Sequence, residues 1–394
     1  MTLRLHKVSK QIDRLQESAV ARAEKLRADL PKVQRALDLA AGHADLAQKA
    51  KTEAERGWNG AMPSCGEAIA FRKSAPAAPA ALALVAVDGS QVYPDRHSAS
   101  LFYAINIGYF ILRSDSGETA ADSEPAVFFE DESLFPDGIL ISNTILNARR
   151  TVDEMSVLAR LAMAERATAP GRPVFALADG GFALRIDEKT FPPAERESLQ
   201  KRFFSAIDSL ARETIPAAGY IARPGGSPVL SLIDLALDPS PKGKAGRGGR
   251  TPFPGLDDRV LFETLLAPGE RSALFEFAAY WNDLYRNREP NQSAHFFYLN
   301  VGQRYPVIAR VEIPEWTAKD PELVDRVHAA LVEQSSVTLN DPYPYALIRA
   351  DEEAFVSGEE KQYLEEQMAV SLIRGGLRLS RSEKLSHKGR ARKH

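Results

Sequence analysis

Uninterrupted apolar runs alternate with amphipathic segments in the middle of the chain, which predicts an α/β protein. Apolar runs of strand length are typical of buried strands, and apolar residues spaced three and four apart are typical of helices. Two amphipathic segments predict helices, at Ser142–Thr168 and at residues 194–214. The apolar runs predict strands at Ala83–Val87, Ser100–Leu112, Pro125–Glu130, Val174–Ala178 and Ala218–Ala222.

The order of these elements is strand, strand, strand, helix, strand, helix, strand. It is the order of the ribonuclease-H-like fold, in which a mixed sheet is covered by helices. The predicted fold class is therefore α/β, with a ribonuclease-H-like mixed sheet as its core. Because a fold does not define an activity, the function has to come from particular residues.

The segments outside this core have a different character. Residues 1–56 read as a helical, coiled-coil-like arm, in which Pro31 is expected to start a second helix. Such an arm pairs with a partner or a second copy, or it packs on its own domain; the pattern leaves these alternatives open. Residues 57–80 are rich in Gly, Ala and Pro and predict a linker, residues 81–375 the main domain, and residues 376–394 a basic tail.

The second half of the main domain has a weaker pattern. Strands are expected at Phe296–Leu299 and Val307–Val311. Helices are expected at Val229–Leu237, Leu256–Leu266, Arg271–Arg288, Pro321–Glu333, Pro344–Phe355 and Glu359–Ile373.

Two predicted strands lead into an acidic turn, and this repetition is the strongest chemical signal. Asp88-Gly89 follows the first strand and Asp179-Gly180 follows the fourth. Either pair alone is a common turn, since Gly supplies a positive φ at little cost. Two carboxylates on rigid strands, with a third from the helix between them, would instead suit a two-metal phosphodiesterase site. Helix spacing does not choose between Asp153 and Glu154 for that third position.

Composition and charge narrow the class of protein. The net charge is −3, but residues 378–394 carry seven Lys/Arg against one Glu, so the tail is +6 and the rest of the chain −9. Such a tail contacts nucleic acid through its phosphates, or it is a solubilising end.

The single Cys65 rules out a disulfide framework, and it reads as an incidental thiol. No apolar run reaches the length of a membrane span, and no signal peptide is evident, so a cytoplasmic protein without membrane contact is expected. No Walker A motif is present, so the chain is not expected to hydrolyse ATP.

The motifs resemble those of the NurA-type DNA double-strand-break repair nucleases. They occur in the order of that family over about residues 81–360. The similar pieces are Val87–Gln91, the helix with Arg149, Arg150 and Glu154, Leu177–Gly180, Gly219–Pro224, Pro268–Ser272, Arg310–Pro314 and Tyr343–Asp351.

The resemblance implies a homodimeric, metal-dependent DNA nuclease that acts in end processing with a HerA-type hexameric ATPase. It implies a 5′–3′ exonuclease, with endonuclease action as a second activity, and Mn²⁺ or Mg²⁺ as the cofactor, with two ions expected. Carried over by position, Asp88, Glu154 and Asp179 would be the metal ligands. We expect Asp88 to bridge the two ions and Glu154, Asp179 and Asp351 to complete their shells. The family usually has His where this chain has Asp351; Asp still suits a hard cation, but metal preference and pH profile follow the residue.

Four further residues are candidates for contact with DNA. Arg150, Arg223 and Arg310 could each pair with a phosphate, although a structural ion pair is an equal reading for each, with Glu312 as a partner for Arg310. Tyr220 could stack on a frayed base or lie in the core. Two alternatives remain for the whole protein. One is a catalytically silent DNA-binding adaptor that docks on a hexameric ATPase, and the weaker one is a metal-dependent phosphatase of small substrates.

Overall fold

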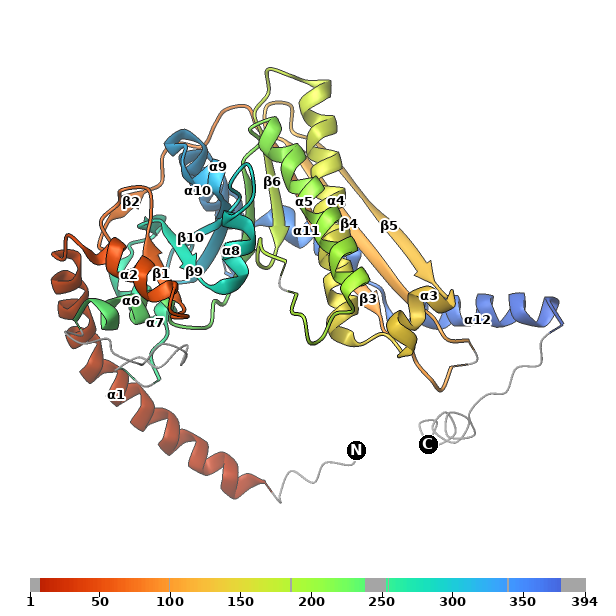
Figure 1. Ribbon diagram of the computed structural model, residues 1–394, viewed down its shortest axis with the longest axis horizontal. Coiled ribbons are helices and arrows are strands. Elements are labelled where there is room, and N and C mark those ends of the chain that lie inside the picture. Colours follow the sequence, from red (N-terminus) through yellow and green to blue (C-terminus); the bar gives the residue numbers. More distant parts are fainter. Residues whose placement is uncertain are drawn as a thin grey trace. The chain divides into compact units, whose positions relative to one another are not determined.

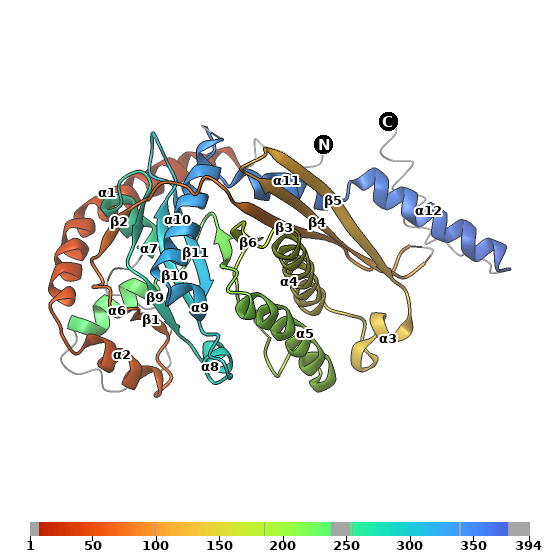
Figure 2. The same ribbon diagram turned by 90° about the horizontal axis from the view of Figure 1, so that it is seen from above.

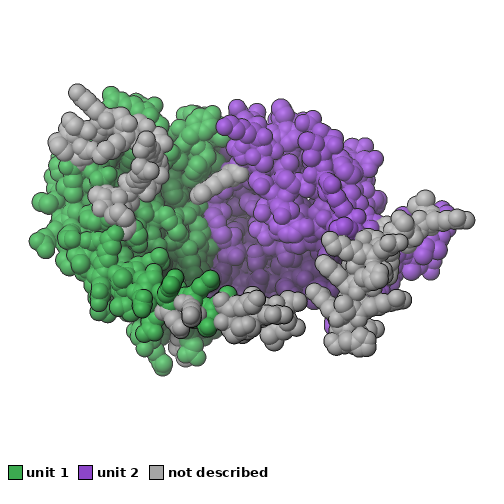
Figure 3. Space-filling view, turned by 90° about the horizontal axis from the view of Figure 1, so that it is seen from below, with its two compact units in different colours: residues 1–77, 220–342 green, residues 78–219, 343–394 purple. Residues whose placement is uncertain are grey.

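The computed structural model describes residues 8–98, 100–184, 186–237, 253, 255–338 and 340–376. The chain divides into two compact units (Figure 3). Unit 1 comprises residues 1–77 and 220–342, and unit 2 comprises residues 78–219 and 343–394. This division differs from the sequence-based one, because the expected main domain of residues 81–375 contributes to both units. The basic tail and the Gly-rich basic run of residues 242–250 lie outside the described residues.

Unit 2 contains the mixed sheet expected from the sequence (Figure 1). Its strands are β3 (Ala83–Val92), β4 (Tyr103–Arg113), β5 (Glu118–Phe128), β6 (Val174–Asp179) and the start of β7 (Ala217–Ile221). Their spatial order is β5-β4-β3-β6-β7, with β3 antiparallel to β4 and parallel to β6. Together with the two intervening helices, this order confirms the ribonuclease-H-like fold.

Helices cover both faces of that sheet. The helices are α3 (Asp131–Leu134), α4 (Asn143–Thr168), α5 (Pro193–Arg212), α11 (Tyr345–Ala354) and α12 (Gly358–Arg374), with a 3-10 turn η2 (Pro136–Gly138). Figure 2 shows α4 and α5 on one face and α11 on the other. Helix α4 begins where the Ser142 side chain accepts a hydrogen bond from the Ile145 amide. Its buried stripe, which includes Val152, Leu158 and Ala162, packs on the apolar residues of β3 and β6.

Unit 1 is a second α/β body. Strands β1 (Gly60–Pro63), β9 (Phe275–Ala278), β10 (Ala294–Asn300) and β11 (Ile308–Pro314) are neighbours in that order, while β2 (Arg72–Ser74) pairs with β8 (Glu270–Ser272). Its helices are α1 (Ser9–Ala41), α2 (Leu46–Ala54), α6 (Pro228–Leu237), α7 (Asp258–Leu265), α8 (Tyr280–Arg286), α9 (Glu315–Ala318) and α10 (Pro321–Ser336).

Three sequence-based predictions are wrong in unit 1. Helix α1 continues through Pro31, because Val33 and Leu37 carry its apolar stripe into the core of the unit. The expected linker contains β1 and β2. The segment Arg271–Arg288, read as one helix, contains β8, β9 and α8, and its aromatic residues pack into a sheet instead of a helical face. Among the described residues, no helix is long and apolar enough to cross a membrane.

Candidate active site

Asp88 and Asp179 leave the sheet of unit 2 side by side. Strands β3 and β6 are parallel, and their last register pair is Val87 with Ala178. The two aspartates are the next residues on each strand, so they lie side by side at the same end of the β3–β6 pairing. Asp179 is the exposed last residue of β6, and Gly180 turns the chain with a φ of 84°. Asp88 differs from the expected turn, because β3 continues to Val92 and pairs Asp88 with Gly108 of β4.

Helix α4 supplies the third carboxylate, and the structure chooses Glu154 over Asp153. Glu154 is only 6% exposed, and its carboxylate lies against Gly89, where a Cβ would come within 2.5 Å of Oε1. Arg150, one helical turn earlier, pairs with Glu154 (Nε–Oε1 3.1 Å) and donates to the Gly89 carbonyl at 3.0 Å. Asp153 instead forms an ion pair with Arg202 of α5.

Helix α11 brings Asp351 to the opposite face of β3. Successive residues of a strand point to opposite faces, so Asp88 faces α11 while Gly89 faces α4. The close approach of α11 needs Gly108, where a Cβ would lie 2.2 Å from the Ala354 amide nitrogen. The end of α11 is fixed by hydrogen bonds from the Ser90 hydroxyl (2.5 Å) and the Asn106 amide (2.9 Å) to the Ala354 carbonyl. The Asp351 carboxyl comes within hydrogen-bonding reach of Asp88.

The pKa values of Asp88, Glu154 and Asp179 are all raised, as expected for carboxyl groups that are buried close together. Burial and then the Asp179 charge raise the pKa of Asp88 to about 7, and Asp351 adds to the rise. Burial likewise raises the pKa of Glu154 to about 7, against the lowering effect of Arg150. Desolvation raises the pKa of Asp179, while a hydrogen bond from the Tyr343 hydroxyl to Oδ1 (2.5 Å) lowers it. The site therefore holds negative charges that destabilise one another.

The chemistry of this donor set fits a divalent cation, although the present side-chain positions do not enclose one. Carboxylate oxygens are the ligands that hard cations prefer, and a cation would relieve the mutual repulsion. Among the described residues, no three His, Cys, Asp or Glu side chains are arranged to hold one metal ion. These carboxylates have protein partners instead: Glu154 pairs with Arg150, Asp179 with Tyr343, and Asp88 Oδ1 accepts the Gly89 amide at 2.7 Å. A bound ion would compete with these partners for the carboxylate oxygens.

The other candidate residues have different surroundings. Arg150 lies in the carboxylate site, whereas Tyr220, Arg223 and Arg310 belong to unit 1. Tyr220 is fully buried, so the reading as a base-stacking residue is replaced by that of a core tyrosine. Arg310 is 8% exposed, pairs with Glu312 at 2.8 Å and lies over two phenylalanine rings, so it is a structural ion pair and not a phosphate contact. Arg223 is exposed, which is compatible with a phosphate contact.

Sequence reasoning missed Tyr343 as a residue of this site. Its hydrogen bond to Asp179 links the start of the α11 segment to the end of β6. The motif that ends in Asp351 begins with Tyr343, so the sequence placed Tyr343 near the site. It did not show that the Tyr343 hydroxyl would bind Asp179.

Comparison with known proteins places the chain in a family. The family model for the NurA domain matches residues 82–356, and the chain belongs to this family. No curated protein matches the sequence.

Three solved structures show a distant similarity to this chain. A crystal structure of NurA with manganese is 9% identical, with a TM-score of 0.46, over 92% of this chain and 98% of that chain. A structure of NurA bound to dAMP and manganese is 13% identical, with a TM-score of 0.37, over 78% and 90%. Drosophila Piwi is 10% identical, with a TM-score of 0.29, over 69% and 29%. At these scores the similarities carry no argument about activity.

Proposed function

We propose that the chain is a metal-dependent deoxyribonuclease, with Asp88, Glu154, Asp179 and Asp351 as its metal ligands. The observation that carries the proposal is the coupling of these acids at one edge of the unit 2 sheet, where the pKa values of Asp88 and Glu154 are raised to about 7. Raised carboxyl pKa values cluster at functional sites. Membership of the NurA domain family supports the same assignment, since all four residues fall within the matched segment.

Each residue of the site has a proposed role in phosphodiester hydrolysis. A bound Mn²⁺ or Mg²⁺ pair would activate water and neutralise charge on the phosphate. Asp88 would be the central ligand, since both Asp179 and Asp351 act on it. Glu154 from α4, Asp179 from β6 and Asp351 from α11 would supply the remaining carboxylate ligands. Arg150, once released from Glu154, is placed to pair with a phosphate oxygen, because guanidinium groups bind phosphate with two hydrogen bonds.

The wider role follows from the family resemblance. We propose 5′–3′ exonuclease action, with endonuclease action as a second activity, in DNA end processing in the cytoplasm. A homodimer working with a HerA-type hexameric ATPase is the proposed assembly.

The direct test measures cleavage of end-labelled linear DNA in Mn²⁺, Mg²⁺ or EDTA, with and without the neighbouring ATPase. Asp88→Asn removes the charge without changing the size of the side chain, and Asp122→Asn, on the exposed face of β5, is the matched control. We expect metal-dependent loss of label in the parent and in the control, and none in Asp88→Asn. Equal cleavage by Asp88→Asn would disprove the site.

The alternative function is a catalytically silent, DNA-binding adaptor. The presence of Asp351 where the family usually has His, and the carboxylates that are satisfied by protein partners, favour it. No cleavage under any of these conditions, with DNA still retarded in a gel-shift assay, would establish the adaptor.

A further inference from the structure

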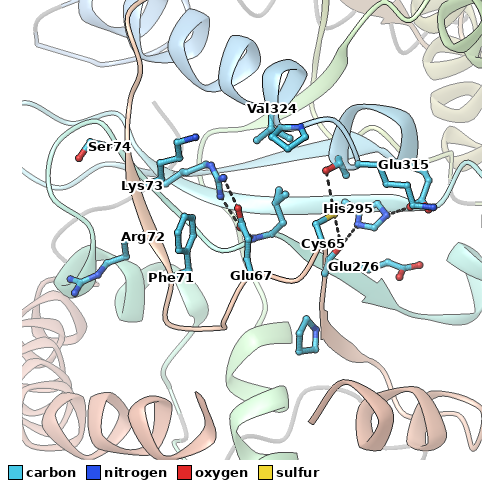
Figure 4. Close-up of a pocket in the computed structure, with 17 residues that line it drawn as sticks. Cys65, Glu67, Phe71, Arg72, Lys73, Ser74, Glu276, His295, Glu315 and Val324 are labelled. Atoms are coloured by element: carbon cyan, nitrogen blue, oxygen red, sulfur yellow. Dashed lines mark hydrogen bonds and ion pairs between the residues drawn. The ribbon is translucent and has the colours of Figure 1, made fainter. Parts of the chain in front are cut away.

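Unit 1 contains a cavity that the nuclease proposal does not use (Figure 4). Its volume is about 720 Å³, within the range of small-molecule sites. Its walls come from the turn after β1, strands β2, β8 and β10, and the segment from α9 to α10. Ser64, His295 and Glu315 all line it, with Arg72, Lys73 and Lys319 among the cations.

The first three residues form a continuous hydrogen-bonded chain. The Ser64 hydroxyl lies 2.8 Å from Nδ1 of His295, and Nε2 of the same ring contacts the Glu315 carboxylate. Hydrogen bonds from His295 and Lys319 outweigh burial and lower the pKa of Glu315 to about 2, so it is ionised and accepts only. Nε2 must therefore carry the proton. In the neutral ring Nδ1 is then an acceptor, and the Ser64 hydroxyl donates to it.

Glu315 is held firmly in this role. Besides His295, its carboxylate accepts from the Ser293 hydroxyl and the Asn291 side-chain amide, both at 3.1 Å, and pairs with Lys319. The imidazole is therefore fixed in both tautomer and orientation. A nucleophile, a base and a third group that orients the base are the general signature of nucleophilic catalysis.

The backbone around Ser64 is a strained, anchored turn. The Glu67 amide donates to the Ser64 carbonyl at 3.2 Å, and the two residues between them have positive φ, 54° at Cys65 and 74° at Gly66. A non-Gly residue with positive φ costs about 1–3 kcal/mol, and such strain gathers at functional sites. Glu67 fixes the turn through a two-point ion pair with the buried Arg271 (2.9 and 2.7 Å) and through the Leu274 amide (2.8 Å).

From this geometry we propose that Ser64, His295 and Glu315 form a second catalytic site, which hydrolyses a small carboxylic ester. Ser64 Oγ attacks the carbonyl carbon while its proton passes to His295 Nδ1. The tetrahedral intermediate expels the alcohol, which takes that proton, and leaves an acyl group on Ser64. A water molecule then gives its proton to Nδ1, attacks the acyl carbon and releases the acid, and the proton returns to Ser64.

Neighbouring groups define the remaining roles. The amide of the residue after the nucleophile is the usual donor to the developing oxyanion, and the Cys65 amide donates to no residue in the described parts of the chain. The Cys65 thiol is not the nucleophile, because it donates to the Ala318 carbonyl (3.2 Å) and burial raises its pKa.

The test uses the full chain, a fluorescent fluorophosphonate probe and the ester p-nitrophenyl acetate. We expect the probe to label the parent on the peptide that contains Ser64, as located by mass spectrometry. Ser64→Ala should lose labelling, and His295→Gln should slow it about 100-fold or more. Ser116→Ala, an exposed serine of unit 2, is the control and should be labelled like the parent. Ester turnover should follow labelling, and metal-dependent DNA cleavage by Ser64→Ala should be unchanged.

Several results would overturn the second site. One is a folded parent protein that the probe does not label. Another is labelling of Ser64→Ala at the rate of the parent, and a third is a label located on a residue other than Ser64. Because the labelled peptide is identified in the parent itself, a variant that fails to fold leaves the test intact. The outcome is also separate from the fate of the carboxylate site in unit 2.

Discussion

Arg150 and Glu154 form an ion pair one turn apart on α4 (Nε–Oε1 3.1 Å), while the adjacent Asp153 pairs with Arg202 of α5. Two neighbouring acids thus have different partners, one in the site and one at a helix contact. Glu154→Gln should lower DNA cleavage at least about 100-fold, the cost of removing one electrostatic contact to a transition state. Asp153→Asn should cleave like the parent and lose about 1 kcal/mol of stability or less. Single-turnover cleavage and thermal unfolding measure the two effects, and the reverse ranking in cleavage would contradict the assignment.

Tyr343 positions Asp179 through the hydrogen bond from its hydroxyl. That bond lowers the pKa of Asp179, so Tyr343→Phe should raise it further. Metal affinity should fall about 10–100-fold, as for other residues that orient a ligand. The pH profile of cleavage should move to higher pH, and saturating metal should restore most of the rate. Tyr363→Phe, on the exposed side of α12, is the matched control. An unchanged metal titration in Tyr343→Phe would remove it from the site.

Stability without metal should fall as the pH rises from about 4 to 7. Asp88 and Glu154 have folded pKa values of about 7 against ordinary values of 3.8 and 4.5, so the folded state binds more protons in this window. The cost of ionising them is complete above about pH 7.5. The buried Asp258, also with a pKa of about 7, contributes in the same direction.

Urea unfolding in EDTA at several pH values measures this dependence. In Glu154→Gln the decline should be smaller by about 1–3 kcal/mol, with the Asp258 part retained. Mn²⁺ binds the ionised acids, so its stabilising effect should grow over the same interval. A decline that is identical in the parent and in Glu154→Gln would show that Glu154 keeps an ordinary pKa.

Most elements of unit 2 could be predicted from the sequence because an apolar pattern buries them, whereas the largely exposed β5 begins at Glu118, well before the predicted strand at Pro125–Glu130. The predicted helix at Ser142–Thr168 differs from α4 by one residue, and the strand at Val174–Ala178 differs from β6 by one. The position of Asp88 could not be predicted fully, because Asp-Gly reads as a turn whereas pairing with β4 keeps it in the strand. The parts of the fold and site that were not predicted depend on contacts between residues far apart in the sequence.

Unit 1 shows why those contacts are invisible in a local pattern. The strands β1 and β2 lie in a segment with the composition of a linker and are strands only because β9 and β8 pair with them. The chain from Ser64 to Glu315 joins residues 251 positions apart, and no spacing rule connects them. Asp351 was found through a motif, and its distance from Asp88 in sequence is comparable.

Gly108 sets the approach of α11 to the sheet. A Cβ there would meet the Ala354 nitrogen at 2.2 Å and the Ala350 oxygen at 2.3 Å, and neither backbone atom can move independently of α11. Gly108→Ala should therefore displace α11, lower the free energy of unfolding by about 1–3 kcal/mol and weaken metal binding through Asp351. Gly171→Ala, with open space around the added carbon, should leave both unchanged. Chemical denaturation and a metal titration test the pair. Normal metal binding in a destabilised Gly108→Ala would separate Asp351 from the site.

Arg223 and Arg310 should respond in opposite ways to mutation. Arg310 is buried against Glu312, which has no exposed surface, so Arg310→Ala leaves a buried carboxylate without that partner. Loss of one member of a buried pair costs about 3–5 kcal/mol, and Arg310→Ala should unfold at a markedly lower temperature. Arg223→Ala should keep its stability but bind DNA more weakly, with a salt dependence reduced by about one phosphate contact.

Thermal melts and DNA titrations from 50 to 200 mM salt distinguish these two arginines. Arg223→Lys is the matched control, since it keeps the charge and should retain the salt slope while losing the two-point contact. A parent-like salt slope in Arg223→Ala would exclude Arg223 from the DNA surface. If Arg310→Ala is as stable as the parent and the salt dependence of its DNA binding is reduced, Arg310 contacts DNA after all. We expect Arg223, and not Arg310, to contact DNA. The Arg310 guanidinium is buried between Glu312 and the Phe277 and Phe296 rings, and a group enclosed on these sides has no free edge for a phosphate.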